Sequence, residues 1–284
     1  MPREGAFFAV DVGASSVKSG LVVDGHAGEV SREPVAREAG ELVAQLLRLR
    51  ERAGGPAWGL CIAGIVDPEA GTLLYSANLG LRDMPLVELL SAEGPPPSVF
   101  VNDLDAAALG EAQEESLALI QVGTGIAARC VVGGRVVPSA GAHAGEVGHL
   151  RFRASGRPCR CGNRGCAEAY GGWSGISSRY REAGRAASSP TALLQPADDW
   201  ERELQADALE AIAFAAAALV AACDPGTLRV GGGVAAALGE TLLEAIRAGL
   251  RDQVLPAAAA ATFVESARLG DASALQGLAL LAQR

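Results

Sequence analysis

Apolar and polar positions alternate in short runs through the first third of the chain, and glycine turns separate these runs. Such alternation is typical of strands with one buried face. It predicts an antiparallel meander of three strands, over Ala6–Val10, Val17–Val23 and Glu29–Ala36. Helical spacing and buried apolar runs then predict helix, strand, strand and helix, over Glu38–Arg52, Ala57–Ile62, Ser98–Val101 and Asp105–Glu115.

The order strand, glycine turn, strand occurs a second time, which indicates an internal duplication. Residues 10–13 (VDVG) align with residues 120–123 (IQVG). A third strand is expected at residues 228–230 and ends in a glycine turn at residues 231–233 (GGG). An apolar helix is expected after it over Val234–Leu250. Meander and strand–helix units together favour α/β domains, each with a mixed sheet.

Length and charge narrow the class of protein. The 284 residues suffice for two modest domains, and the net charge of -9 argues against nucleic-acid or membrane-surface partners, which are polyanionic. No apolar run of signal-peptide length opens the chain, and the longest one, Ala211–Cys223, is shorter than the ~20 residues that span a bilayer. We therefore expect a cytoplasmic protein in which Ala211–Cys223 is a buried helix.

Three of the six cysteines lie within eight residues, Cys159, Cys161 and Cys166, in a glycine-rich loop. His149 lies ten residues upstream. Three thiolates and one imidazole would complete a tetrahedral Zn²⁺ site, which would be structural because four protein ligands leave no position for an activated water. The alternative is a loop of surface thiols, with His149 as an ordinary hydrogen-bonded residue. Clustered cysteines in a reduced compartment favour the metal.

Two acidic residues follow buried strands and are candidates for phosphoryl chemistry. Asp11 ends the first strand, two residues before Gly13, and Asp103 follows the strand at Ser98–Val101. Buried carboxylates cost stability unless they have partners, so we predict a metal–phosphate contact and a general base. The alternative for Asp103 is the N-cap of the following helix, a role for which Asp105 competes.

The glycine turns can cradle phosphate groups with backbone N–H groups, although each one alone is more often a hairpin turn. Neither a Walker A motif nor a G-x-G-x-x-G fingerprint is present. If the metal folds the loop, Glu146, His149 and Glu168 converge, and with the carboxamides of Asn78 and Asn102 they form a polar set suited to hydroxyl groups. The alternative is that the two glutamates are solvated loop charges.

Taken together, these segments resemble the ROK family (repressors, open reading frames and sugar kinases) of the actin-like ATPase superfamily. The matches are Asp11–Lys18 to D-x-G-x-[TS]-x-x-K, Leu60–Asp67 to the sugar-side loop, Asn78–Leu86 to N-L-x-W-x-x-x-P-L, Asn102–Glu111 to N-D-x-x-A-A-A-L-x-E, Gly123–Ile126 to the second phosphate motif, Gly145–His149 to G-E-x-G-H and Cys159–Glu168 to C-x-C-G-x-x-G-C-x-E. Several positions depart from the pattern: Ala14, Ala63, Leu81 and the bulky Arg129, which stands where small residues are usual.

The resemblance implies two actin-like (RNase H-like) domains around a central cleft, residues 1–109 with a C-terminal helix at about 271–284, and residues 110–270 with a zinc loop at 149–168. It implies transfer of phosphate from ATP, with Mg²⁺, to a hexose 6-hydroxyl, with Asp103 as general base. The implied sugar ligands are Gly64, Asn78, Asn102, Glu146, His149 and Glu168. The implied nucleotide ligands are Asp11, Gly13, Ser15, Lys18, Gly123, Thr124, Gly125, Gly231 and Gly232. The implied zinc ligands are His149, Cys159, Cys161 and Cys166.

A glucokinase-like hexose kinase is the leading hypothesis. The alternatives are a kinase for N-acetylglucosamine, N-acetylmannosamine, fructose, mannose or allose, and a catalytically silent sugar sensor. From the length, and from a first phosphate strand that starts near Phe7, we expect no DNA-binding domain of the kind that the family's repressors carry. The family suggests a homodimer or homotetramer. Lys18, the only lysine, falls where the first phosphate motif carries its own.

Overall fold

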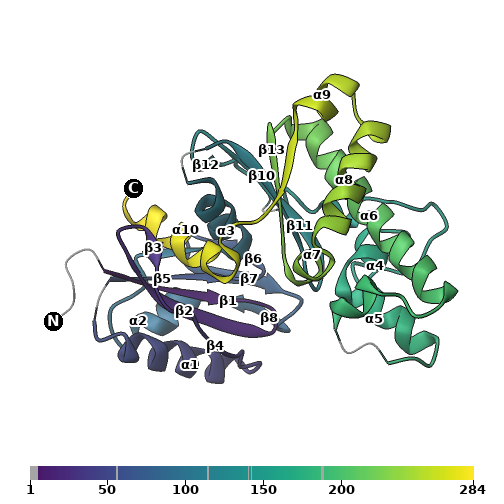
Figure 1. Cartoon of the computed structure of the whole chain (residues 1–284). Helices are drawn as coiled ribbons and strands as arrows, with labels where there is room; N and C mark the ends of the chain where they lie inside the picture. Colours follow the sequence, from purple (N-terminus) through teal and green to yellow (C-terminus); the bar gives the residue numbers. More distant parts are fainter. Residues whose placement is uncertain (1–5, 56, 114, 140, 142, 187–188) are drawn as a thin grey trace. The chain divides into compact units, whose positions relative to one another are not determined.

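The computed structural model describes residues 6–284 except 56, 114, 140, 142, 187 and 188, and it is an α/β structure with two compact units (Figure 1). Unit 1 comprises residues 1–114, 134–143 and 269–284, and unit 2 comprises residues 115–133 and 144–268. The two mixed-sheet units confirm the predicted fold class. The domain boundaries expected from the resemblance stay a prediction.

Unit 1 is built on a sheet in the order β3-β2-β1-β5-β9, with β4 also pairing with β2. These strands are β1 (Phe7–Val12), β2 (Ser16–Val23), β3 (His26–Ala27), β4 (Ser31–Pro34), β5 (Ala57–Ile62) and β9 (Val99–Asn102). The pairs β1–β2 and β2–β4 are antiparallel, which confirms the meander, and β5 and β9 add parallel strands. A small sheet of β6 (Ile65–Asp67), β7 (Thr72–Ser76) and β8 (Leu81–Met84) was not predicted.

The sheet of unit 1 lies between two helical layers (Figure 1), and successive side chains of β1 point to opposite faces of it. Phe8, Val10 and Val12 lie in one apolar core with α1 (Ala39–Arg52) and α2 (Leu86–Ser91). On the opposite face α10 (Ser273–Ala282) packs against β1, β5 and α3 (Asp103–Ala112). Asp11 therefore lies on the face covered by α10. The short strand β12 (Arg135–Val136) and the 3₁₀ turn η3 (Gly270–Ala272) complete unit 1.

Helices α3 and α10 approach so closely that only glycine fits at the crossing. A Cβ on Gly277 would lie 1.8 Å from the carbonyl oxygen of Ala106, and one on Gly110 would lie 1.9 Å from that of Ser273. Beside the crossing, the buried Glu111 carboxylate accepts hydrogen bonds from the Leu269 N–H (2.9 Å) and the Ser273 hydroxyl (2.7 Å). This cluster fixes α10 on the helix that carries Asp103.

Replacing Gly277 by alanine is expected to lower the free energy of unfolding by about 1–3 kcal/mol, because the added methyl overlaps a backbone oxygen that cannot rotate away. Gly40 is the matched control: it lies in α1, and a Cβ added there would meet no atom within 4 Å. Gly40→Ala should raise stability by about 0.5–1 kcal/mol, since alanine is the better helix former. Urea denaturation followed by circular dichroism measures both, and equal stability of the two variants would contradict the crossing.

Unit 2 repeats the arrangement of unit 1. Four strands of its sheet follow in the order β11-β10-β13-β14, with an antiparallel pair β10–β11 and a parallel pair β10–β13. This matches β2-β1-β5-β9 and supports the internal duplication. The strands are β10 (Leu117–Val122), β11 (Ile126–Val132), β13 (Thr227–Gly231) and β14 (Phe263–Ser266).

The helices of unit 2 are α4 (Glu168–Gly171), α5 (Trp173–Glu182), α6 (Asp199–Cys223), α7 (Gly233–Leu238), α8 (Glu240–Gln253) and α9 (Pro256–Ala261), with 3₁₀ turns η1 (Val147–His149) and η2 (Pro190–Leu194). The single helix predicted over 234–250 is wrong: Gly239, at φ 51°, divides it into α7 and α8. By length and composition α6 could cross a membrane, but it packs against α4 and α8, and half of its most apolar stretch is buried. It is the core helix of unit 2, as predicted for Ala211–Cys223.

Candidate active site and metal cluster

A partly buried ion pair lies beside the first glycine turn. Asp11 and Lys18 are directly opposed across β1 and β2, and the Lys18 Nζ lies 3.0 Å from an Asp11 carboxylate oxygen. Lys18 Nζ also lies 3.6 Å from Asp271. Burial has the largest influence on the pKa of Lys18 and lowers it, but the Asp11 and Asp271 carboxylates outweigh burial and raise the pKa. The ammonium ion therefore compensates the charge of Asp11, which is only 4% exposed.

A thiol missed by the sequence prediction lies next to Asp11. Cys61, at the matching position of the parallel strand β5, donates to the Asp11 carboxylate at 3.6 Å. Burial, and after it the carboxylates of Asp11 and Asp103, raises the pKa of Cys61 well above its ordinary value. From the sequence we predict only that Cys61 is a core residue, and the structure shows that it lies near both Asp11 and Asp103.

Asp103 is the first residue of α3, and it does not cap that helix. The cap is Asn102, whose Oδ1 accepts hydrogen bonds from the Leu104 N–H (2.9 Å) and the Asp105 N–H (3.2 Å). The alternative that Asp103 or Asp105 is the N-cap is therefore wrong, because the helix begins two residues before the predicted Asp105.

The carboxamide of Asn102 also fixes the sugar-side loop. Its Nδ2 donates to the carbonyl oxygen of Gly64 at 2.8 Å. Gly64 has a φ of 144°, and a Cβ there would lie 2.5 Å from the Tyr75 carbonyl oxygen, so a side chain would displace the loop. Both ends of the carboxamide are thus engaged within unit 1, and its direct contact with a sugar stays a prediction.

Arg37 is a second residue that sequence reasoning missed. Its guanidinium donates to the carbonyl oxygen of Ala14, in the first glycine turn beside Gly13 and Ser15, at 3.0 Å. It also donates to the carbonyl oxygen of Asn78. The turn predicted for phosphate and the segment predicted for sugar are thereby joined. No signal in the sequence marks Arg37, because both acceptors are backbone atoms far from it along the chain.

Hydrogen bonds from the N-terminus of α5 support the second glycine turn, Gly123–Gly125. The carbonyl oxygens of Gly123 and Thr124 accept hydrogen bonds from the N–H groups of Trp173 (2.9 Å) and Ser174 (3.0 Å). In a trans peptide the carbonyl and N–H point in opposite directions, so the N–H groups of Thr124 and Gly125 are directed away from α5. Two parallel backbone donors in a turn are suited to phosphate oxygens.

The turn after β13 lies against the turn after β10. A Cβ on Gly232, which follows Gly231 and has a φ of 96°, would lie 2.5 Å from the Val122 carbonyl oxygen. The residues predicted for nucleotide binding in unit 2 are thereby brought together. Glu168 borders them: its Oε2 accepts a hydrogen bond from the Ile126 N–H at 3.0 Å, and a Cβ on Gly125 would lie 2.3 Å from that oxygen.

The four predicted zinc ligands converge. The ligand atoms of His149, Cys159, Cys161 and Cys166 all lie within 4.8 Å of one another. His149 Nδ1 lies 3.7 Å from Cys159 Sγ, and Cys161 Sγ lies 3.7 Å from Cys166 Sγ. Thiolates bound at ~2.3 Å to a tetrahedral Zn²⁺ are about 3.8 Å apart, so the donor set and its spacing fit zinc.

Backbone contacts order the loop that carries the four predicted ligands. The Cys159 N–H donates to the Asn163 carbonyl oxygen at 2.8 Å, and isolated bridges join Arg151 to Cys166 and Pro158 to Arg164. Burial, and then the neighbouring thiols Cys161 and Cys159, raises the pKa of Cys166 to about 12. The other ring nitrogen, His149 Nε2, lies 3.8 Å from the Glu146 carboxylate.

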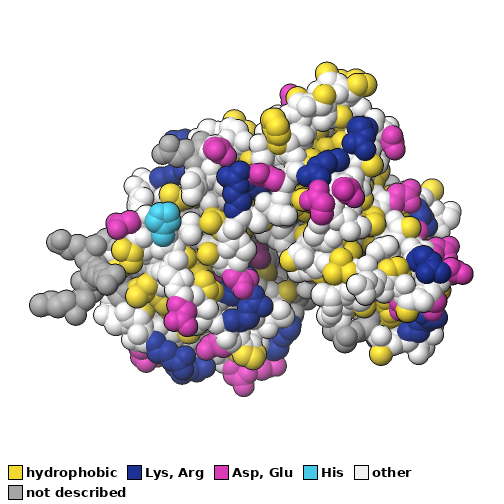
Figure 2. All heavy atoms as spheres, viewed as in Figure 1, with side chains coloured by type: hydrophobic (Ala, Val, Ile, Leu, Met, Phe, Trp, Pro, Cys, Tyr) yellow, Lys and Arg dark blue, Asp and Glu magenta, His cyan; other side chains and the backbone are white. Residues whose placement is uncertain are grey.

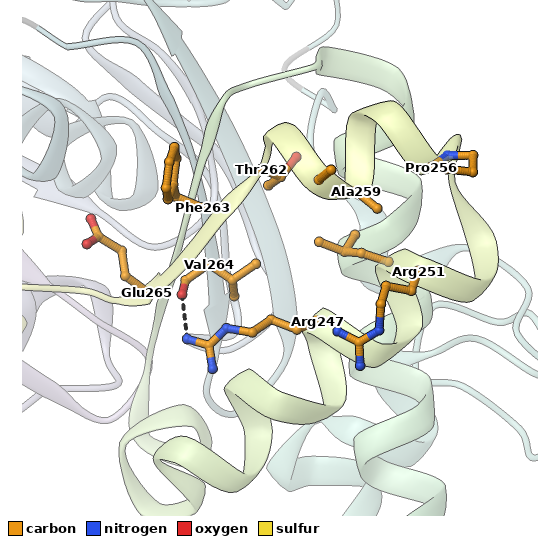
Figure 3. Close-up of a pocket in the computed structure, with 10 residues that line it drawn as sticks. Arg247, Arg251, Pro256, Ala259, Thr262, Phe263, Val264 and Glu265 are labelled. Carbon is orange, nitrogen blue, oxygen red and sulfur yellow. Dashed lines mark hydrogen bonds between the residues drawn. The ribbon is translucent and has the colours of Figure 1, made fainter.

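A cavity of about 730 Å³ lies elsewhere in unit 2, between α8, α9 and β14 (Figure 3). Arg247 borders it and donates to the Val264 carbonyl oxygen at 2.8 Å. Among the described residues that line this cavity, none belongs to the predicted site. On the face shown in Figure 2, acidic and basic side chains are interspersed, with no broad patch of one sign.

Comparison with known proteins agrees with this geometry. The family model described as ROK family matches residues 8–284. A glucokinase of Halalkalibacterium halodurans is 31% identical over 253 residues, which are 80% of this chain and 76% of that protein. An N-acetylmannosamine kinase of Salmonella typhimurium is 29% identical over 288 residues, 97% of each chain. The crystal structure of a ROK family glucokinase from Streptomyces griseus in complex with glucose and AMPPNP has a TM-score of 0.81, with 25% identity over 98% of this chain and 99% of that one.

Proposed function

The chain belongs to the ROK family and is a sugar kinase of that family, and we propose that it transfers the γ-phosphoryl group of ATP to the 6-hydroxyl of a hexose, with Asp103 as general base. The observation that carries the proposal is the N-terminus of α3. Asn102 supplies the helix cap, so the Asp103 carboxylate is not needed for that role. A carboxylate at this position can accept the proton of a sugar hydroxyl as its oxygen attacks phosphorus.

The nucleotide would be held largely by backbone N–H groups. We assign the phosphates to Gly13 and Ser15 in unit 1 and to Gly123, Thr124, Gly125, Gly231 and Gly232 in unit 2. Mg²⁺, when bound with ATP, neutralises charge on the phosphates. Asp11 would lie near that ion through water, and Lys18 keeps the Asp11 carboxylate oriented by an ion pair at 3.0 Å.

The sugar hydroxyls would be bound by Gly64, Asn78 and Asn102 in unit 1 and by Glu146, His149 and Glu168 in unit 2. The position of His149 supports a double role: Nδ1 faces the thiols and Nε2 faces Glu146. Zn²⁺ on His149, Cys159, Cys161 and Cys166 would be structural, because four protein ligands fill a tetrahedral site. It would orient the imidazole toward the sugar.

N-acetylmannosamine is the second candidate substrate, because a kinase for that sugar aligns with 97% of this chain at 29% identity. Few side chains decide between a hydroxyl and an acetamido group, so the family alone does not separate the two sugars. A cytoplasmic location, a homodimeric or homotetrameric state and the absence of nucleic-acid and membrane partners stay predictions.

A coupled assay with ATP, Mg²⁺ and a panel of sugars tests the proposal. The panel contains glucose, mannose, fructose, allose, N-acetylglucosamine and N-acetylmannosamine, and ³¹P NMR of the product identifies the phosphorylated oxygen. We expect kcat/KM for one hexose to exceed that for the acetamido sugars by about tenfold or more. Phosphorylation of N-acetylmannosamine alone would support the second candidate. Turnover of none of the sugars would refute the kinase and favour a silent sensor.

A further inference from the structure

Arg129 is a buried arginine in β11, a few residues beyond the second phosphate turn, at a position where the family has small residues. Only 9% of it is exposed. Its Nη1 donates hydrogen bonds to the carbonyl oxygens of Ala144 (2.6 Å) and Ala128 (2.9 Å). A buried guanidinium is costly unless its donors are satisfied, so these bonds bind Arg129 firmly to the backbone of residue 144.

The backbone that Arg129 holds leads directly into the predicted sugar segment, Gly145–His149. The Ala128 N–H donates to the Gly145 carbonyl oxygen at 2.7 Å. Gly145 has a φ of 84°, and a Cβ there would lie 1.8 Å from the Ala128 carbonyl oxygen and 3.0 Å from Arg129 Nη1. Through these contacts residues 144 and 145 pack directly against β11.

Glu146 comes immediately after this anchor, and its side chain is 44% exposed. Its carboxylate faces His149 Nε2 at 3.8 Å, which is longer than a hydrogen bond, so its position depends on the backbone that carries it. Farther along, Gly148 lies against β11 as well, since a Cβ there would be 2.2 Å from the Ile126 carbonyl oxygen. The segment is thus fixed at Gly148 by close packing and at Ala144 by the guanidinium.

We infer that Arg129 is a positioning residue for sugar recognition: it holds the backbone before Glu146 so that Glu146 and His149 present a fixed pair of polar groups to the sugar. The inference rests on the proposed role of this segment. It also gives the bulky Arg129, which departs from the family pattern, a structural role. A lysine at this position would restore only part of these contacts, because its ammonium is a compact point charge and lacks the planar array of N–H donors of a guanidinium.

The test compares Arg129→Ala and Arg129→Lys with Arg229→Ala. Arg229 is the matched control, a buried arginine of the same unit whose Nε lies 2.9 Å from Glu265 and which lies outside the sugar segment. Arg129→Ala should raise KM for the preferred sugar by about 10- to 100-fold, as expected for loss of charge-assisted hydrogen bonds, while KM for ATP changes little. Arg129→Lys should recover part of the loss, and millimolar guanidinium should lower the sugar KM of Arg129→Ala.

Arg229→Ala should leave the sugar KM unchanged even where it lowers the melting temperature more than Arg129→Ala does. An unchanged sugar KM in Arg129→Ala, or an equal rise in KM for ATP, would overturn the inference while wild-type turnover still supports the proposed kinase. Hydrogen exchange of residues 144–149 gives a readout without activity. Faster exchange in Arg129→Ala but not in Arg229→Ala supports the anchor even if the wild type phosphorylates no sugar, and unchanged exchange refutes it.

Discussion

Replacing Asp103 by asparagine is expected to lower kcat for the preferred sugar by about 10²- to 10⁴-fold, the usual contribution of a positioned general base. The carboxamide has the same shape as the carboxylate but cannot accept the hydroxyl proton. The fold should be retained, because Asn102 caps α3 and keeps its bond to Gly64. Initial rates with ATP and Mg²⁺ give kcat and KM, and thermal melting checks stability.

Asp105 provides the matched control, since it lies in the same first turn of α3. Asp105→Asn should leave kcat close to the wild-type value. For Asp103→Asn, a loss in kcat with little change in the sugar KM means that the carboxylate acts in the transition state and contributes little to ground-state binding. The expected loss corresponds to about 3–5 kcal/mol of transition-state stabilisation. Undiminished turnover by Asp103→Asn would exclude it as the base.

Loss of a zinc ligand is expected to impair sugar and ATP binding together. In unit 2, Glu168 follows Cys166 by two residues and accepts a hydrogen bond from the Ile126 N–H at 3.0 Å, immediately after the second glycine turn, Gly123–Gly125. The next helix, α5, donates to the carbonyl oxygens of Gly123 and Thr124. The loop that carries the predicted zinc ligands is therefore continuous with the elements that support this turn. We expect Cys159→Ser to lower kcat/KM about 100-fold or more, because a structural metal contributes folding energy directly.

Elemental analysis should find about one Zn²⁺ per chain in the wild type and much less in Cys159→Ser. Cys223→Ser is the control, because Cys223 is exposed and lies outside the four-ligand cluster. It should keep both zinc and activity. Zinc-free protein with wild-type KM values for sugar and ATP would show that the loop keeps its shape without a metal.

Local signals in the sequence predicted much of the fold and the metal cluster. Strand alternation and glycine turns identified β1, β2, β10 and β11, because each of these patterns is contained in a stretch of about ten consecutive residues. The cysteine spacing predicted ligands that the structure brings within 4.8 Å. The residues of the phosphate turns were predicted from motif and repetition, and their contacts with ligands stay predictions.

Features that depend on distant contacts were not predictable. Either Asn102 or Asp103 could cap a helix, judged by residue type alone. The structure shows that the Asn102 side chain caps α3 with its oxygen while its Nδ2 donates to the carbonyl oxygen of Gly64, a contact that the sequence does not reveal. The Lys18–Asp271 ion pair joins the two ends of the chain, and no local pattern encodes it. The sequence shows Arg129 only as a departure from a family pattern. Its hydrogen bond to the carbonyl oxygen of Ala144 could not be predicted, because the acceptor is a backbone atom and carries no residue-type signal.

The crossing of α3 and α10 also orders events during synthesis. During translation, residues 273–282 leave the ribosome only after all of unit 2 has been made, yet they cover β1, β5 and α3 near the beginning of the chain. Until then the nascent unit 1 exposes the apolar face that α10 later buries, while the chain needed for unit 2 is already complete. Unit 2 can therefore fold first, and the helix that carries Asp103 gains its final support last.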